Sequence, residues 1–312
     1  MKSNCLDPYK KYLNDEEVQR LCSILKLRHK VSNLNKIIYH YTSHQGLFGI
    51  FASNTLRATN YSNLNDSGEM KYGTKIVKEI IDNIKVIDNN NEKVTFLTNL
   101  ESVFEAKFML SNFYVTCFSQ KNDLLSQWRA YGSNQGRICI GFQTDELRST
   151  EDNFSIGKVI YNKEEQIKII RDWISEFIKF IPRVKELLQE EYGDCFNIYY
   201  ENTSDILLQQ ICLFKDYAFH EEEEIRAITW IEDPNQNIGK LNFNCNETGI
   251  IPYIDIIGNY ENHDNGVLPI KEILIGPSRN KHKLFKVIPL LIHKYKYPID
   301  ILIRESDIPF ED

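Results

Sequence analysis

The sequence predicts an α+β fold, with a split and mostly antiparallel β-sheet at its core and helical insertions between the strands. Short β-rich segments recur along the 312 residues, and helical patterns of unequal length separate them, whereas a doubly wound parallel fold needs a regular β-α alternation. The glycine-rich turn with which such a fold binds a dinucleotide is also missing from the sequence. We expect one domain over residues 1–312, made of a helical extension at 1–36, a core at 37–280 and a C-terminal helix and strand at 281–312.

Helices and strands in the first third of the chain are predicted from caps and hydrophobic periodicity. Asn14 and Glu17 have capping-box spacing, as do Asp66 and Glu69, and Ser43 stands where a cap is expected. The predicted elements are, in order, a helix over Asp15–Leu27, a strand over Ile37–Tyr41, a helix from Ser43 to Ala52, an extended piece over Leu56–Thr59, a helix that opens at Asp66 and carries Ile76 to Ile84, and a helix over Val94–Met109.

The rest of the chain is predicted to hold two long helical patterns and to end rich in strands. Pro182 is expected to kink or split the first long helix, and Pro252 is expected to confine its strand to a sheet edge. The polar stretch from Asn244 to Thr248 is expected to be a loop. The predicted strands are Phe113–Ser119, Arg137–Phe142, Lys158–Tyr161, Glu224–Ile231, Ile250–Ile256, Ile270–Ile275 and Ile301–Arg304. The predicted helices are Leu124–Tyr131, Glu164–Glu191, Ser204–Phe219 and Asn280–Lys294.

Composition and charge narrow the class of protein. A net charge of −7 disfavours a strongly basic nucleic-acid-binding protein, although it leaves room for a local basic patch. Seven cysteines are scattered without a Cys-x-x-Cys pair or zinc-finger spacing, so we expect buried free thiols in a reducing compartment. The first residues lack the apolar stretch of a signal peptide, and the longest apolar run, Val287–Ile292, is far too short to span a membrane. We therefore expect a cytoplasmic protein with no membrane partner.

Familiar catalytic motifs are missing, since there is no P-loop, no His-Glu-x-x-His and no Gly-x-Ser-x-Gly. Polar residues near predicted strand ends are the remaining candidates. His40, within Tyr39–Thr42, can point into a cleft and offer a hydrogen-bond donor or acceptor, or it can be a half-buried strand histidine bonded to the backbone. Asn65, Asp66 and Glu69 are explained by a helix cap. A functional role for them requires that they face the same cleft as His40.

A third group of candidates surrounds the strand predicted at 113–119 and the helix that follows it. Ser119 leaves the strand and can simply turn the chain. Trp128 and Tyr131 are three residues apart and share a helix face, where aromatic side chains more often fill a core than stack on a ligand. Cys117 lies inside the β-run, so a buried and inert thiol is expected there.

The fourth group is the acidic run that follows Lys215. If a strand starts within His220–Arg226, then Glu222, Glu224 and Arg226 share one face, because side chains of a strand alternate. Two carboxylates on one face repel each other, which raises the pKa of one, whereas Arg226 favours keeping both ionised. The run is also consistent with a solvated acidic face that is paired to Arg226. No spacing of carboxylates and histidines is specific for a metal, so no metal ligand is assigned.

In their order along the chain, these segments resemble a bacterial family defined as domain of unknown function 2971. The resemblance covers roughly residues 37–280, and the family name carries no activity. The pieces that carry it are Tyr39–Thr42, Leu64–Asp66 with Glu69, Cys117–Ser119, Trp128 with Tyr131 and Gly132, Gly136–Phe142, Lys215, Phe219, Glu222, Glu224, Arg226 and Ile270–Gly276.

The same residues also resemble the ADP-ribosyltransferase superfamily, which has a strand histidine followed by an aromatic residue and a late Glu-x-Glu strand. This resemblance implies an ADP-ribosyltransferase-like split sheet that binds NAD as a substrate. The implied roles are ribose binding by His40, stacking on nicotinamide by Tyr41 or Tyr61, and acid catalysis by Glu224 with Glu222 as its partner. The four consecutive glutamates of this run leave open which one faces the cleft. The other residues expected to line the NAD cleft are Thr42, Asn65, Asp66, Ser119, Trp128, Tyr131 and Arg226.

The chemistry suits these residue types, because breaking the nicotinamide–ribose bond builds positive charge that a carboxylate stabilises and an aromatic ring can face. We expect an NAD-dependent ADP-ribosyltransferase, a bacterial toxin or phage-defence effector that modifies a protein or a nucleic acid and acts with partner proteins of such a system. A ligand-binding sensor would use the same cleft without turnover and would tolerate loss of Glu224. A metal-dependent nuclease or hydrolase would need three converging carboxylate or histidine ligands and a basic groove.

Overall fold

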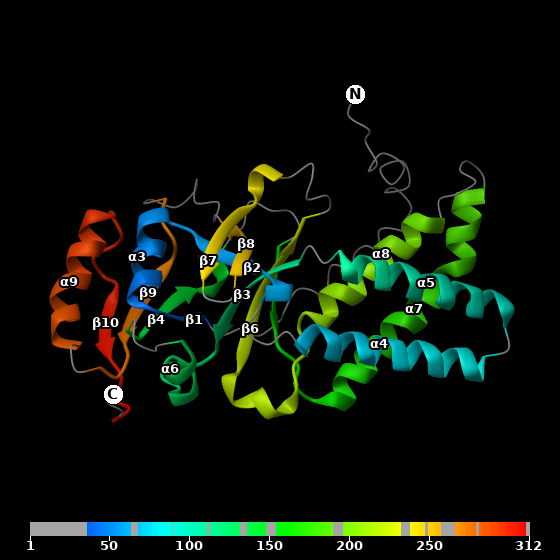
Figure 1. Ribbon diagram of the computed structural model, residues 1–312, viewed down its shortest axis with the longest axis horizontal. Coiled ribbons are helices and arrows are strands. Elements are labelled where there is room, and N and C mark those ends of the chain that lie inside the picture. The colour runs from blue at the N-terminus through cyan, green and yellow to red at the C-terminus, as the bar shows by residue number, and fades with distance from the viewer. Residues whose placement is uncertain are drawn as a thin grey trace.

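The computed structural model has a β-sheet at one end and a lobe of long helices at the other (Figure 1). It describes residues 36–63, 68–88, 90–110, 113–131, 136–147, 154–189, 196–231, 238–246, 249–256, 266–278 and 281–309. The strands are β1 (Ile37–Thr42), β2 (Leu56–Asn60), β3 (Phe113–Ser119), β4 (Ile138–Gln143), β5 (Ser155–Lys158), β6 (Glu224–Trp230), β7 (Asn242–Asn246), β8 (Gly249–Ile256), β9 (Ile270–Ile275) and β10 (Leu302–Glu305).

The strands follow the order β10-β9-β4-β1-β3-β2-β8-β7, and β6 and β5 extend from β3 as a branch. Within the described strands, β10 runs parallel to β9 and the other pairings are antiparallel. The predicted α+β class with a mostly antiparallel sheet is therefore confirmed.

The sheet divides at β3, which has three neighbouring strands. On one edge, β6 pairs with all seven residues of β3. On the other edge, β2 pairs near the start of β3, at Tyr114 and Val115, whereas β1 pairs at its end, at Ser119. Between these two pairings, none of the described strands lies against this edge of β3. The polar backbone groups in the middle of β3 that face this gap therefore need partners from side chains.

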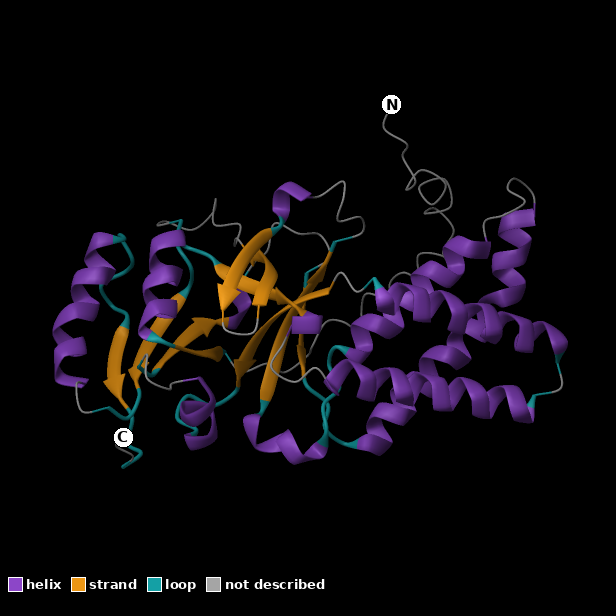
Figure 2. Ribbon diagram, in the orientation of Figure 1, coloured by secondary structure: helices purple, strands orange, loops and turns teal. Residues whose placement is uncertain are grey.

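The long helices are concentrated on one side of the sheet. Figure 2 shows α4, α5, α7 and α8 beyond the branch, whereas α3 and α9 lie together at the opposite end. The helices are α3 (His44–Ser53), α4 (Gly68–Ile87), α5 (Asn91–Met109), α6 (Leu125–Tyr131), α7 (Lys163–Gln189), α8 (Phe196–Ile211) and α9 (Lys281–Lys294). Short 3-10 helices cover Tyr61–Asn63, Thr144–Glu146, Tyr217–Glu222 and Ile238–Lys240.

Two large apolar cores lie on the two faces of β3. Because neighbouring side chains of a strand point to opposite faces, Phe113 and Val115 pack with the helical lobe, whereas Tyr114 and Phe118 pack with the core that includes α3 and α9. This shared strand joins the two halves of the molecule and places the end of β3 between them.

Two predictions about strands near the sheet edges are wrong. Asn244, Cys245 and Asn246 are not in a loop but belong to β7, which forms a hairpin with β8. β8 is not an edge strand, since it pairs with both β7 and β2. Its pairing with β2 ends at Tyr253, so the missing N–H of Pro252 removes no bond on that side.

Other predicted boundaries also need correction. The strand expected at Lys158–Tyr161 lies at β5, and Ile160 makes an isolated bridge instead. α7 continues through Pro182 without splitting. The helix expected to reach Phe219 ends at Ile211, because the chain tightens into 3-10-type bonds there. The helix expected at 15–27 and the extension up to residue 35 lie outside the described residues.

Two observations bear on the expected compartment. Cys139 and Cys212 are buried free thiols, as expected, whereas Cys245 is exposed on β7. Over the described residues, no helix has both the length and the apolar character needed to cross a membrane.

Candidate active site

The gap between β1 and β2 is where β1 presents His40. The Nδ1 atom of His40 lies 2.9 Å from the carbonyl oxygen of Cys117, in the middle of β3. A carbonyl can only accept, so Nδ1 carries the proton and Nε2 of the neutral ring is an acceptor. Burial lowers the pKa of His40, which keeps the ring neutral at pH 7. The two alternatives for this histidine are both realised, because its ring bonds to the backbone and also lines a pocket.

Glu222 and Glu224 are brought together by a turn and not by a common strand face. The 3-10 helix Tyr217–Glu222 ends at Glu223, whose φ of 42° lies in the left-handed region that residues with a Cβ rarely adopt. β6 then begins at Glu224, so Glu222 lies outside the strand, and the predicted face of three residues is wrong in this respect. Both carboxylates nevertheless reach the Nζ atom of Lys215, at 2.6 Å from Glu222 and 3.1 Å from Glu224.

Arg226 connects this turn to the helical lobe. Its side chain is 1% exposed and donates to both carboxylate oxygens of Glu224, at 2.8 and 2.9 Å. It also donates to Glu69 in the first turn of α4, at 2.5 Å, and to the hydroxyl of Tyr61, at 3.0 Å. A further bond of 2.7 Å reaches the carbonyl oxygen of Cys212. Arg226 is therefore fixed from several directions.

The ionic cluster, by which we mean Glu69, Lys215, Glu222, Glu224 and Arg226, contains three carboxylates and two cations. Lys215 lies 3.2 Å from Glu69 as well, so it contacts all three carboxylates. Taking ions out of water costs several kcal/mol each, and pairing offsets this cost only while the partners are present. With all five groups ionised, the cluster carries one excess negative charge, which a cation or a proton in its neighbourhood can neutralise.

The pKa values separate the two pocket carboxylates. Burial by itself raises the pKa of Glu224, but Arg226 and Lys215 outweigh burial and lower this pKa to about 2. The pKa of Glu222 is raised, mainly by burial, because Lys215 compensates only in part. The pKa of Lys215 is raised by the carboxylates around it, against the opposite effect of burial. Glu224 is thus the carboxylate that stays ionised at neutral pH, and Glu222 is better suited to exchange a proton.

A small pocket of about 40 Å³ lies against these carboxylates. It has room for about one water molecule, whereas pockets for organic ligands usually measure roughly 300–1,000 Å³. The residues that line it come from β1, β3, α6 and the turn before β6, and are Tyr39, His40, Tyr41, Cys117, Phe118, Gln127, Tyr131, Glu222 and Glu224. The expected meeting of His40, Glu222 and Glu224 in one aromatic-lined site is therefore present.

Two of the predicted aromatic residues have their polar atoms engaged by the protein. Tyr41 lines the pocket, but its hydroxyl donates to the carbonyl of Lys121 and accepts from the amide of Leu124, both at 3.0 Å. Trp128 is 1% exposed, packs edge-on against Tyr41 and donates from Nε1 to Asp123 at 2.6 Å. Trp128 therefore fills a core, which is the more common of the two roles considered.

The remaining predicted site residues lie beside or beneath the pocket. Tyr61 is buried next to Arg226, with its ring centroid 5.6 Å from the guanidinium. Ser119 donates to the carbonyl of Glu222 at 2.8 Å and so holds the turn. Thr42 ends β1 against α3, where a side chain at Gly46 would collide with it. The expected residues at positions 65 and 66 lie outside the described residues.

Glu69 is the member of the ionic cluster that the sequence analysis missed. It was explained as part of a helix cap, but its oxygens lie within bonding distance of Arg226, Tyr61 and Lys215. A signal for this role exists in the sequence, because Glu69 falls four and seven residues before Gly73 and Ile76 on the buried face of α4. A buried position for a glutamate on an apolar helix face calls for a charged partner.

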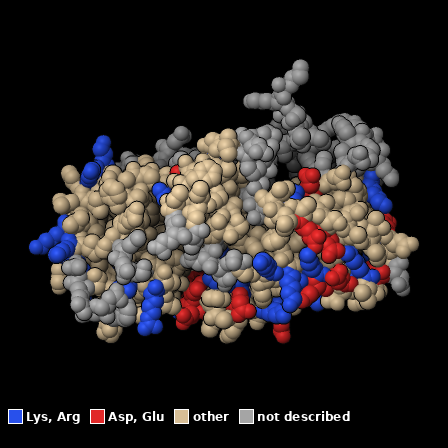
Figure 3. Space-filling model, viewed as in Figure 1, with Lys and Arg blue, Asp and Glu red and all other residues tan. Residues whose placement is uncertain are grey.

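Metal ligands and surface charge give two further observations. In the part of the chain that the structure describes, no three His, Cys, Asp or Glu side chains are grouped so as to hold a metal ion. Figure 3 shows acidic and basic side chains interspersed along the helical lobe, and mainly basic ones at the end that carries α9. Residues 281–296 contain five lysines and no acidic residue. We call this surface, formed by Lys281, Lys283, Lys286, Lys294 and Lys296, the α9 basic patch.

Comparison with known proteins gives one match, to the family described as "Protein of unknown function (DUF2971)", over residues 127–227. The matched segment contains most of α6, Lys215 and the start of β6, and it does not reach His40 or Glu69. The match supports the resemblance to this family, whose description names no activity. No curated protein and no solved structure matches the chain.

Proposed function

We propose that the protein is an ADP-ribosyltransferase that uses NAD as its substrate and breaks the nicotinamide–ribose bond at the pocket of His40, Glu222 and Glu224. The observation that carries this proposal is the convergence of a neutral strand histidine and two carboxylates on one aromatic-lined pocket. The split and mostly antiparallel sheet adds support, because the resemblance to this superfamily implies such a sheet.

The proposed chemistry uses the different states of these side chains. When the bond breaks, its electron pair leaves with nicotinamide and positive charge develops on the ribose, which the ionised Glu224 stabilises. The Nε2 atom of His40 accepts a hydrogen bond from a ribose hydroxyl. The nucleophile of the acceptor then bonds to the ribose carbon and passes its proton to Glu222, whose raised pKa suits this step.

Access for NAD requires a movement of α6. The pocket of about 40 Å³ is far smaller than a dinucleotide. Gln127 and Tyr131 form its wall from α6, and Tyr131 is already 41% exposed. We therefore place the opening of the site at α6, with β1, β3 and the Glu222 turn as the fixed side.

A ligand-binding sensor without turnover is the second candidate. Both carboxylate oxygens of Glu224 are already bonded to Arg226, and one of them also to Lys215. Such a carboxylate has little capacity left for a substrate hydroxyl, which favours a structural role in a site that only binds.

The proposed acceptor of the ADP-ribosyl group is a protein or a nucleic acid, which the enzyme would modify as a bacterial toxin or phage-defence effector. The α9 basic patch supplies an anion-attracting surface in a chain of net charge −7, and this favours testing nucleic acid first.

The proposal is tested by nicotinamide release from NAD, measured by mass spectrometry on the purified full chain. We expect release by the wild type and a reduction of at least about a hundredfold in Glu222→Gln, Glu224→Gln and His40→Ala, in line with losses of charge stabilisation at other enzymes. Glu221→Gln is the matched control, because this exposed neighbour does not line the pocket. Circular dichroism confirms that each variant is folded.

The outcomes separate the two candidates. Release that persists in both glutamate variants would place the chemistry elsewhere. Absence of release with NAD binding that is lost on His40→Ala would favour the sensor. Absence of both release and binding would overturn the use of NAD altogether.

A further inference from the structure

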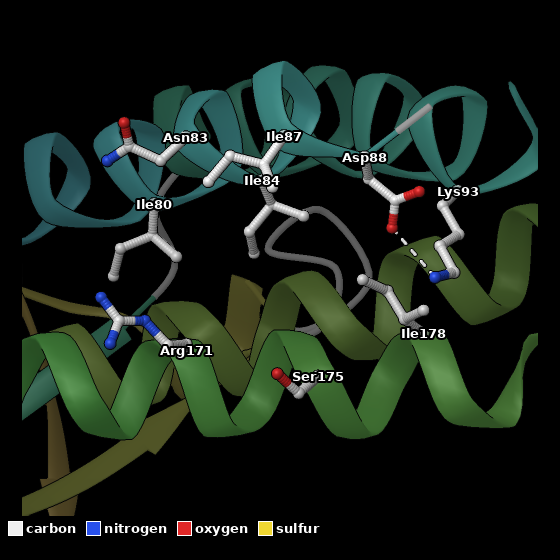
Figure 4. A pocket seen from close by; sticks show the side chains of 9 residues that line it. All are labelled: Ile80, Asn83, Ile84, Ile87, Asp88, Lys93, Arg171, Ser175 and Ile178. Carbon is white, nitrogen blue, oxygen red and sulfur yellow. Dashed lines mark hydrogen bonds and ion pairs between the residues drawn. The ribbon is translucent and has the colours of Figure 1, made fainter. Parts of the chain in front are cut away.

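A second pocket of about 450 Å³ lies between α4 and α7, away from the candidate active site (Figure 4). It is lined by Ile80, Asn83, Ile84, Ile87, Asp88, Lys93, Arg171, Ser175 and Ile178, and we call it the α4–α7 pocket. Its volume falls within the range of roughly 300–1,000 Å³ that is usual for organic ligands.

The walls of the α4–α7 pocket are mainly apolar. Ile80 and Ile84 project from α4 toward α7, and Ile178 faces them from the other side (Figure 4). Ile87, at the end of α4, is 80% exposed. Covering such a surface with an apolar group is favourable, by about 25 cal/mol for each Å² of apolar area removed from water.

The two ends of the pocket differ in charge. At one end, Asp88 and Lys93 form an ion pair of 2.9 Å, so the ammonium there is neutralised. At the other end lies the guanidinium of Arg171, beside Ile80 (Figure 4). Among the described residues no carboxylate pairs with Arg171, whereas Lys168, one turn earlier on α7, is paired with Asp172. Arg171 is therefore the cation available to a ligand.

The spacing along α7 sets the size of the ligand. Arg171 and Ile178 are separated by seven residues, which is roughly 10 Å of helix. This matches a medium-length alkyl chain with an anionic group at one end. A guanidinium binds a carboxylate through two parallel hydrogen bonds, which makes the carboxylate the best complement to Arg171.

We propose that the α4–α7 pocket binds a small amphipathic carboxylate, with its head group on Arg171 and its tail on Ile80, Ile84 and Ile178. This site is separate from the pocket of His40, Glu222 and Glu224, since the two pockets share no residue. Its ligand class follows from the apolar walls, the unpaired cation at one end and the neutralised cation at the other.

The test uses the full chain and sodium decanoate below its micelle-forming concentration, with binding measured by isothermal titration calorimetry. We expect saturable binding to the wild type that is weakened about tenfold or more in Arg171→Gln, since a charge-assisted bond is lost. Ile84→Trp fills the pocket and is expected to abolish binding. Lys168→Gln removes a cation from the same helix outside the pocket and is expected to bind as the wild type does.

Decylamine, which is cationic at pH 7, serves as the ligand control and is expected to bind at least about tenfold more weakly than decanoate. The proposal is overturned if the wild type shows no saturable binding, if Arg171→Gln binds decanoate as tightly as Lys168→Gln does, or if decylamine binds equally well. Because Arg171 is exposed, its substitution leaves the fold intact and keeps the test decisive even where Ile84→Trp fails to fold.

Discussion

Glu224 is the carboxylate of the ionic cluster on which acid stability depends most. Its pKa is lowered from an ordinary value of 4.5 to about 2. A group whose pKa is depressed by folding contributes stability above its unfolded pKa, and that contribution is lost as the pH falls toward the folded pKa. The free energy of unfolding is therefore expected to decrease between about pH 4.5 and pH 2, with Glu224 among the causes.

Glu224→Gln is expected to lower the free energy of unfolding at pH 7 by about 3 kcal/mol, because it leaves Arg226 and Lys215 buried with fewer carboxylates. The difference from the wild type is expected to shrink at pH 3.5, because below its ordinary pKa of 4.5 the carboxylate of Glu224 binds a proton in the unfolded chain while it stays ionised in the folded one, which lowers the stability of the wild type. Urea unfolding at the two pH values measures this. The exposed Glu221→Gln control is expected to stay within about 0.5 kcal/mol of the wild type, and an equal loss for Glu224→Gln at both pH values would contradict the ionised state assigned to it.

At the level of single residues, the sequence supported the candidates that lie on strands better than those on turns. His40 and Glu224 were identified because strand ends are places where side chains reach a cleft. The role of Glu222 depends on the left-handed conformation of Glu223, which no local pattern predicts for a glutamate. Glu69 was missed because a cap explained it sufficiently, although its helical spacing placed it on a buried face.

Among the elements, α3 has a clear local determinant. The Oγ atom of Ser43 accepts from the amide of Gly46 at 3.1 Å, as an N-cap does. Ser43→Ala is expected to lower the free energy of unfolding by about 1 kcal/mol, because it leaves that amide without its partner. Chemical denaturation measures the loss, and Ser102→Ala, on the exposed side of α5, is the control expected to stay within about 0.5 kcal/mol. Equal effects of the two substitutions would argue against the cap.

The short helix α6 is attached to the C-terminal segment through one carboxylate. Asp123 accepts from Trp128 Nε1 and from Ser306 Oγ, both at 2.6 Å, and from the amide of Asp307 at 3.0 Å. Asp123→Ala is expected to speed amide hydrogen exchange in α6 and in residues 302–309, since all three bonds are lost together. Exchange in α5 is the internal reference and should not change. Unaltered exchange in α6 would show that Asp123 does not hold it.

The elements show why some boundaries could be predicted and others could not. β3 and α3 match their predicted positions closely, because alternation and a serine cap are local signals. β7 is polar and largely exposed, so its sequence resembles a loop, and pairing with β8 alone makes it a strand. The interior position of β8 depends likewise on where the pairing with β2 ends.

The whole molecule is expected to unfold as one unit. β3 contributes side chains to both cores, and Arg226 joins β6 to Glu69 of the helical lobe. Trp173 is buried in the lobe and Trp128 near the sheet end, so variants that retain only one of them report on each half. In each variant, the fluorescence transition is expected to coincide with that of circular dichroism. An earlier transition for Trp173 would show that the lobe unfolds separately.

The order and pairing of the strands in the whole sheet could not be predicted from the sequence. The class of fold follows from short strands and unequal helices, but the strand order does not. His40 and Glu224 meet because β1 and β6 approach β3 from opposite edges, and this depends on contacts between segments far apart in the chain. In the sequence, the helices of the lobe lie between β1 and β6. The hydrophobic periodicity of α4 and α7 shows that one side of each helix is buried, but it does not indicate which face of the sheet they pack against.

The position of β6 in the chain also affects biosynthesis. β3 is made early, but the strand that pairs with all its residues follows only after β4, β5, α7 and α8. Until the ribosome has released β6, the apolar strand Phe113–Ser119 has an open edge that can pair with another chain. A chain that stops at residue 223 is therefore expected to collect in the insoluble fraction of expressing cells, and the stage between the synthesis of β3 and that of β6 is when the growing protein most needs a chaperone.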